Sequence, residues 1–145
     1  MPFRFPLAAV LLVRENAEKR EERKLQQILH EMVRIRYQVE QLDAEMANAH
    51  TVREQAMQRP IPAFQLHTFL SQVQSAAERK KPLIQRLRTL EKERDQQLKV
   101  YQAAHRDHET LIEILRKQRE AYEQERARSQ QKQLDDMFIA RRHRS

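Results

Sequence analysis

The stretch LQQILHEMVRIRYQVEQLDAEMANA, residues 25–49, decides the fold. Its apolar side chains recur at alternating intervals of three and four residues: Leu25, Ile28, Met32, Ile35, Val39, Leu42, Met46 and Ala49. This heptad pattern keeps one apolar stripe of an α-helix turned toward a partner helix. The same frame extends back to Leu7, so we predict a first helix over residues 7–58, about 78 Å long.

The composition supports long helices and argues against several other classes of protein. The 145 residues contain no Gly, Cys or Trp, and 34% of them are charged. Without Gly the chain has few places for the tight turns of β-sandwiches, barrels, P-loops and Rossmann folds. Without Cys it has no disulfide, Cys-ligated zinc or thiol chemistry, which fits the cytoplasm. The net charge of +7 favours acidic partners, although the charges are mixed along the chain.

A short apolar run opens the chain, beginning after Arg4 and ending at Val13. No small-residue cleavage site follows it, because Arg14 comes next. The run is also too short to cross a bilayer. We therefore expect the start of a helix here and not a signal peptide.

The strongest helix breaker in the chain is Pro60-Ile61-Pro62. Two prolines around one residue remove two backbone donors and push Arg59 and Ile61 out of the α region. We therefore predict a short turn over residues 59–63 and a second helix over residues 64–141 that folds back antiparallel. Pro82 lies inside this helix and is expected to kink it without ending it.

The second helix has a heptad frame of its own. The predicted seam residues are Leu66, Leu70, Val73, Ala77, Ile84, Leu87, Leu98, Tyr101, Ile112, Leu115 and Tyr122. A fold-back at Ile61 pairs residues whose numbers add up to about 122, so Val39 would meet Ile84. The chain is thus expected to be all-α: an antiparallel two-helix coiled-coil hairpin in one domain, residues 1–145. Its longer second helix would project alone beyond about Leu115.

Polar residues also fall in the predicted seam. Arg14, Glu18 and Glu21 would face His108, His105 and Tyr101 in this register. The two histidines lie three residues apart and are of the type that binds metals, but no further ligand is evident. A polar layer that fixes the register is the better interpretation. We expect no metal, no cofactor and no catalytic activity, because a two-helix seam offers no closed pocket.

Two groups of apolar residues fall outside the predicted seam. Phe64 and Phe69 are predicted to be exposed near the turn, where they would form a contact site or cap the coiled coil. The tail carries Leu134, Met137, Phe138 and Ile139 beside several arginines. It would be a frayed end, a docking element that orders on binding, or a basic amphipathic segment on a membrane surface.

Three short stretches together carry a resemblance that covers the whole chain. They are Phe3-Arg4-Phe5-Pro6-Leu7 at the start, Phe64-x-x-x-x-Phe69-Leu70 after the break, and Gln131-Lys132-x-Leu134-Asp135-Asp136-x-Phe138 at the end. The order and spacing of these three stretches resemble those of the FliJ family of flagellar export proteins. The YscO group of injectisome-type secretion is a less close match.

The resemblance implies a fold, a location and a set of partners. Members of this family are antiparallel coiled coils of the bacterial cytoplasm that act at the cytoplasmic face of the inner membrane. They engage the hexameric export ATPase, the cytoplasmic domain of the export-gate membrane protein, and export chaperones. The chain would couple the ATPase ring to the gate mechanically, and ATP chemistry would belong to the partner.

The resemblance also implies two binding surfaces. The gate surface falls by position on Phe69, Val73, Ala76 and Lys80, with Leu42 as the candidate from the first helix; Lys80 departs from the family pattern, as does Pro82. The terminal end of the hairpin would enter the ATPase ring. Its expected contacts there are Arg126, Arg128, Lys132, Leu134, Phe138, Arg141 and Arg142.

Two other classes of function remain open from the residues alone. A generic structural coiled coil would form an obligate oligomer, whereas the export protein would be largely monomeric, and sedimentation separates them. A basic nucleic-acid-binding helical protein would bind DNA or RNA with an affinity that falls steeply with salt. The export role predicts no nucleic-acid partner.

Overall fold

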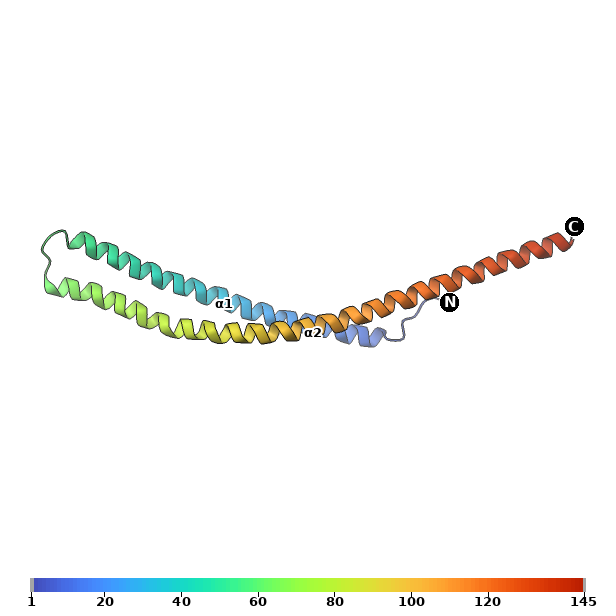
Figure 1. Cartoon of the computed structure of the whole chain (residues 1–145), viewed down its shortest axis with the longest axis horizontal. Helices are drawn as coiled ribbons and strands as arrows, with labels where there is room; N and C mark the ends of the chain where they lie inside the picture. The colour runs from blue at the N-terminus through green and yellow to red at the C-terminus, as the bar shows by residue number, and fades with distance from the viewer. Residues whose placement is uncertain (1, 145) are drawn as a thin grey trace. The chain divides into compact units, whose positions relative to one another are not determined.

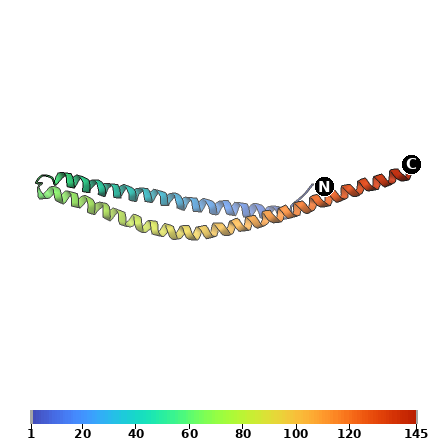
Figure 2. The same ribbon diagram turned by 45° about the horizontal axis from the view of Figure 1, so that its top comes forward.

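Two helices make up almost all of the computed structural model, which describes residues 2–144. Helix α1 runs over Ala8–Ala56 and helix α2 over Ala63–Arg144. The two helices lie side by side and antiparallel (Figures 1 and 2). The all-α, two-helix hairpin fold predicted from the heptads is confirmed.

Proline and the local hydrogen bonds set the ends of both helices. Pro6 lies in the turn before α1, where its missing N–H leaves no partner unsatisfied. The Ala8 amide donates to the Phe5 carbonyl at 3.1 Å. At the other end, Met57 still donates to Arg53 at 2.9 Å, but Pro60 and Pro62 have no amide to continue the helix. Helix α2 then continues without interruption through Pro82.

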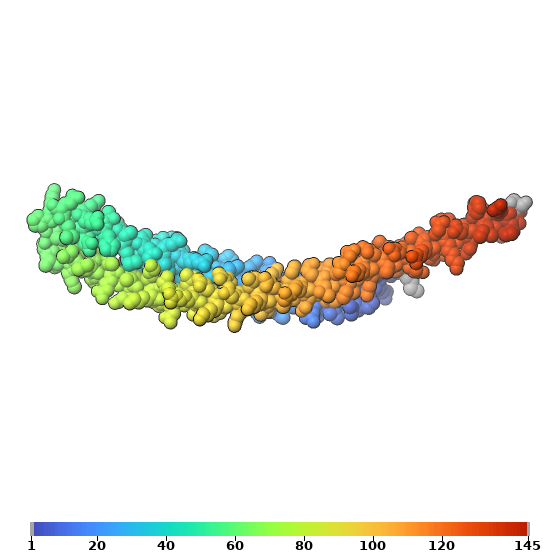
Figure 3. Space-filling model, in the orientation of Figure 1, coloured from blue at the N-terminus to red at the C-terminus, as the bar shows by residue number. Residues whose placement is uncertain are grey.

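The chain divides into two compact units that each contain part of both helices. One unit is residues 21–101, and the other combines residues 2–20 with 102–144. In the first unit, Met32, Ile35 and Leu90 form the buried core, and half-buried Ile28, Val39, Leu83 and Leu87 pack against it. Figure 3 shows side chains of α1 and α2 meeting along this unit.

The predicted frame of α1 is confirmed. Each of its seam residues from Leu25 to Ala49 is buried or half-buried, and the deepest are Met32, Ile35, Leu42 and Ala49. The alternating intervals of three and four residues between apolar side chains therefore identified the face of α1 that meets α2.

The predicted frame of α2 is wrong at three seam positions, and the other predicted seam residues are half-buried. The buried or half-buried residues of α2 are Leu66, Phe69, Val73, Ala76, Ala77, Lys80, Leu83, Ile84, Leu87, Leu90, Glu91, Arg94, Gln97, Tyr101, Ala104, His108, Leu111, Ile114, Leu115 and Tyr122. Leu70, Leu98 and Ile112, which were predicted in the seam, are instead exposed. Val39 and Leu83 both pack against the core cluster, whereas Ile84, the predicted partner of Val39, is not among the residues that do so.

Ion pairs between the helices test the predicted register. In the unit 21–101, Arg79 binds Glu45 at 2.9 Å and Lys80 binds Asp43 at 2.7 Å. Arg86 binds Glu31 at 3.1 Å. The residue numbers of the Arg79 and Lys80 pairs add up to within two of the predicted 122, whereas Arg86 reaches a carboxylate about one turn away from that register.

The terminal unit contains two further features. The residues before α1 bring the Phe3 ring to the Tyr122 ring of α2, with the ring centroids 5.4 Å apart. The expectation that α2 is uncovered from Leu115 onward is therefore corrected, because Phe3 lies against Tyr122. Residues 123–144 are exposed throughout and have no facing stretch of α1 (Figure 1).

Candidate partner-binding surfaces

The residues expected to contact the gate lie mostly in the seam. Ala76 is 0% exposed and Leu42 is 8% exposed, so both are covered by the opposite helix. Phe69 and Val73 are half-buried. Lys80 donates a hydrogen bond to Asp43 at 2.7 Å, which places Lys80 and Leu42 at the same level of the hairpin.

The exposed residues near the turn are a different set. Phe64 is 68% exposed, as predicted, but Phe69 turns into the seam and Leu70 takes the outward position. Met57, which precedes the turn, is also exposed. We call Met57, Phe64 and Leu70 the turn surface. Sequence reasoning missed Leu70, because Phe69 and Leu70 are both apolar and only the packing of α1 selects between them.

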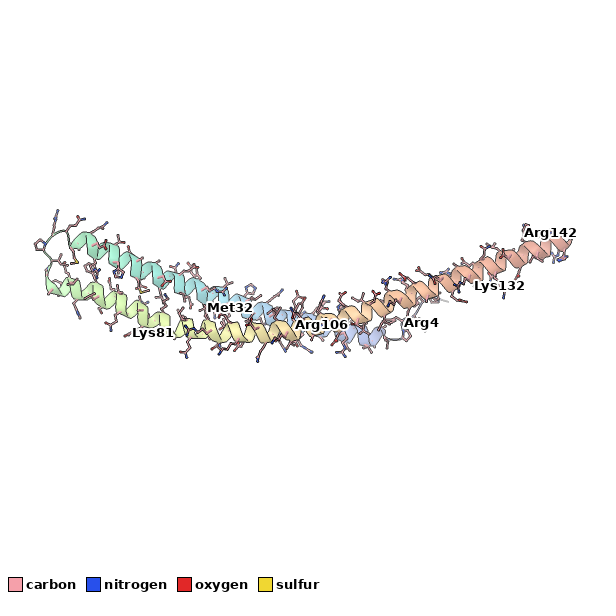
Figure 4. All side chains as sticks on the ribbon, in the orientation of Figure 1. Arg4, Met32, Lys81, Arg106, Lys132 and Arg142 are labelled. Atoms are coloured by element: carbon pink, nitrogen blue, oxygen red, sulfur yellow. The ribbon has the colours of Figure 1, made fainter. Side chains whose placement is uncertain are left out.

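The residues expected to contact the ATPase lie on the exposed end of α2. Figure 4 labels Lys132 and Arg142 on this stretch. Leu134, Met137 and Phe138 line a shallow groove of about 430 Å³ together with Asp135 and Arg141. Leu134 is 60% exposed and Phe138 is 68% exposed. We call Leu134, Met137, Phe138 and Arg141 the tail surface; it combines apolar side chains with positive charge.

The start of the chain forms a groove with this end of α2. A second shallow groove, of about 720 Å³, is lined by Pro2, Tyr122, Glu125, Arg126, Ser129, Gln130 and Gln133. Arg126 therefore lies beside the N-terminal residues, whereas Arg128 and Lys132 are exposed outside both of these grooves.

A charged layer joins α1 and α2 in the terminal unit. The Glu18 carboxylate accepts hydrogen bonds from Nδ1 of His105, at 2.7 Å, and from Nδ1 of His108. Arg14 donates to Asp107 at 3.4 Å, so it does not take the position opposite His108 that the register predicted. In the other unit, Gln97 donates to the Glu21 carboxylate at 2.7 Å.

The hydrogen bonds in this layer shift two pKa values. The bond to His105 lowers the pKa of Glu18 from 4.5, more strongly than burial raises it. The same bond raises the pKa of His105 from 6.5. Each group thus stabilises the charged form of the other.

Residues 2–144 hold no group of three or more His, Asp or Glu side chains suited to bind a metal ion. No helix among them has a stretch of sufficient length and hydropathy to span a membrane.

Comparison with known proteins places the chain in a family. The model of the family described as Flagellar FliJ protein matches residues 3–145. No curated protein and no solved structure matches the chain. The match covers the helices, the turn and the tail alike. The chain therefore belongs to the FliJ family, and its role is associated with flagellar protein export.

Proposed function

We propose that the chain couples the hexameric export ATPase to the cytoplasmic domain of the export gate and also binds export chaperones. It would do so in the cytoplasm, at the face of the inner membrane where its partners lie. The tail surface carries this proposal, because its apolar side chains are exposed on a stretch of α2 that no part of α1 covers. Such a patch is typical of a site that a partner covers.

The tail surface is proposed to bind the ATPase ring. Leu134, Met137 and Phe138 would be buried by the ring, and the cations Arg126, Arg128, Lys132, Arg141 and Arg142 would meet acidic loops. Because α2 is one continuous helix from Ala63 to Arg144, the turn surface and the tail surface belong to the same hydrogen-bonded element. A displacement at one end is therefore passed along a backbone that is internally bonded.

The gate is proposed to bind near the turn. Ala76 and Leu42 are covered by the opposite helix, so they would support the site from within the seam. Direct contact would come from the accessible edges of Phe69, Val73 and Lys80 together with Phe64 and Leu70 of the turn surface.

Export chaperones are proposed to use a separate face of α1. Leu29, Val33 and Tyr37 are exposed and lie four residues apart, which puts them on one side of the helix. Val33→Glu is expected to weaken chaperone binding without weakening ATPase binding, as measured with purified chaperones and purified ATPase.

The decisive experiment measures binding of the full chain to a purified flagellar-type export ATPase. Leu134→Ala with Phe138→Ala should weaken binding by about tenfold or more, because two anchors are lost. Leu98→Ala with Val100→Ala is the matched control, since these are exposed apolar residues of α2 outside the tail. Equal binding by the two double variants would refute the tail site.

A further inference from the structure

A shallow groove of about 640 Å³ lies on α2 within the unit 21–101, away from the tail and from the turn. It is lined by Ala77, Lys80, Lys81, Ile84, Gln85, Arg88, Thr89 and Lys92. Four of these side chains are cationic, none is acidic, and Ala77 and Ile84 provide an aliphatic floor. We call it the basic groove; Figure 4 labels Lys81.

The spacing of these residues defines one face of the helix. Ala77, Lys81, Ile84, Arg88 and Lys92 follow one another at intervals of three or four residues. The seam is formed by other positions, among them Leu83, Leu87 and Leu90. Lys81, Arg88 and Lys92 are exposed, whereas Ala77, Lys80 and Ile84 are half-buried, so the basic groove runs along the flank of α2 beside the seam.

Cations near the groove differ in whether a carboxylate neutralises them. The cations directed at α1 form ion pairs with it: Lys80 with Asp43, and Arg86 with Glu31. In contrast, Lys81, Arg88 and Lys92 form no hydrogen bond or ion pair with any side chain between residues 2 and 144. Three positive charges thus line the groove without an internal counter-charge.

We propose that the basic groove binds an acidic helical segment of a partner protein. An aliphatic side chain of the partner would lie over Ala77 and Ile84, and its carboxylates would pair with Lys81, Arg88 and Lys92. The inference does not rest on the proposed coupling function, because none of these three cations belongs to the ATPase or gate surfaces.

The size and lining of the groove favour this partner over other anions. From Lys81 to Lys92 the helix rises by about 16 Å, which is too far for a single phosphate to bridge. No aromatic side chain lines the groove to stack a nucleic-acid base. A membrane surface is bound through large apolar side chains that insert among lipids, and the floor here is only Ala77 and Ile84. An acidic amphipathic helix presents carboxylates and an aliphatic side chain at the same spacing of three and four residues.

Fluorescence anisotropy tests the proposal with the full chain and a labelled helical peptide. The peptide carries two leucines four residues apart, flanked by glutamates. Lys81→Glu with Arg88→Glu should weaken binding by about tenfold or more, because it reverses two facing charges. The matched control is Lys99→Glu with Arg106→Glu, which changes the same residue types at the same seven-residue separation outside the groove. The control should weaken binding less than about threefold, because distant charges are screened.

Three further probes test the role of the aliphatic floor and the class of partner that binds. Replacing both leucines of the peptide by alanine should weaken binding. Single-stranded DNA and phosphatidylserine vesicles should bind more weakly than the acidic peptide at the same salt concentration. The proposal is overturned by equal losses in the two charge-reversal variants, by no effect of the leucines, or by tighter binding of DNA or vesicles that the groove variant abolishes.

Discussion

A single carboxylate, Glu18, forms hydrogen bonds to two imidazoles of α2. Its side chain is 15% exposed, while those of His105 and His108 are 47% and 17% exposed. Other charged groups around it are Arg14 and Asp107, which pair with each other, and Glu109, whose charge also favours protonated His105. The layer joins the start of α1 to α2, so its protonation affects the stability of this end of the hairpin.

The effect of pH on this layer has a definite sign. The pKa of His105 is raised in the folded chain, so its contribution is complete below 6.5 and is lost as the pH rises through the higher folded-state pKa. The pKa of Glu18 is lowered, so its contribution is present above 4.5 and is lost as the pH falls through the lower folded-state pKa. The layer therefore stabilises the hairpin most between pH 4.5 and pH 6.5.

Glu18→Gln should return the pKa of His105 toward 6.5, because the hydrogen-bonded negative charge is lost. An NMR titration of the histidine ring protons measures this directly. Glu22→Gln, at an exposed position of α1, should leave the pKa of His105 raised. An unchanged pKa in Glu18→Gln would show that another group controls His105.

Sequence reasoning found part of this layer and missed the rest. The register placed Glu18 opposite His105, and the structure joins them. It placed Arg14 opposite His108, but both histidines bind Glu18, and Arg14 binds Asp107. A heptad frame fixes the level of a residue along the helix, whereas the choice among several polar partners depends on side-chain reach and rotamer.

At the scale of the helices, α1 was predictable in its frame, whereas α2 was predictable only in part. On α1 the unbroken run from Leu25 to Ala49 fits one frame, although Ile28 and Met32 are each followed by a second apolar residue. On α2 apolar residues occur in adjacent pairs, such as Phe69 with Leu70 and Leu83 with Ile84, and either member continues a pattern of three and four. The packing of α1 against α2 decides between them, and a pattern within one helix does not contain that information.

Truncation of a seam residue tests the corrected frame. Leu90 is 0% exposed in the core cluster, so Leu90→Ala should lower the free energy of unfolding by about 2–5 kcal/mol through lost burial and a cavity. Leu98 belongs to the predicted frame but is 39% exposed, so Leu98→Ala should lower the free energy of unfolding by only about 0.5–1 kcal/mol. Urea unfolding followed by circular dichroism measures both, and a larger loss for Leu98→Ala would restore the predicted frame.

Charge exchange tests the register between the helices. Arg86 donates to Glu31 from both Nε, at 3.2 Å, and Nη2, at 3.1 Å. The pair is partly exposed, so Arg86→Glu or Glu31→Arg alone should cost about 1 kcal/mol or less. The double exchange should recover most of that loss in a double-mutant cycle. Glu31→Arg with Arg88→Glu should recover nothing, since Arg88 is exposed and forms no ion pair with α1, and recovery there would indicate a shifted register.

In the whole molecule, each helix of the hairpin covers the seam residues of the other. The seam of α1 is covered by α2 of the same chain, with Met32 and Leu90 both buried. An obligate oligomer is therefore not needed to cover the apolar stripe. Sedimentation equilibrium at micromolar concentration should give the mass of one chain, 17.5 kDa. A concentration-independent dimer mass would instead favour the generic structural coiled coil.

Burial is distributed unevenly between the two units. All side chains that are buried among residues 2–144 lie within 21–101. In the terminal unit, apolar residues such as Leu11 and Leu111 are only half-buried. The hydrogen bonds of Glu18 to His105 and His108, the Arg14–Asp107 pair and the Phe3–Tyr122 contact also join its parts. Beyond Tyr122, stability comes from the helix itself, since residues 123–144 are exposed throughout. Regions with few buried apolar contacts open at lower free energy.

Amide hydrogen exchange should therefore show three levels of protection. Residues 21–101 should exchange most slowly, the paired ends 8–20 and 102–122 faster, and residues 123–144 fastest. Phe3→Ala should speed exchange around Tyr122, because it removes the ring contact, and should leave the core around Leu90 unchanged. Phe64→Ala is the control, since Phe64 is an exposed aromatic residue near the turn and should leave exchange around Tyr122 unchanged. Equal protection along the whole of α2 would mean that the terminal stretch is stabilised by contacts other than these.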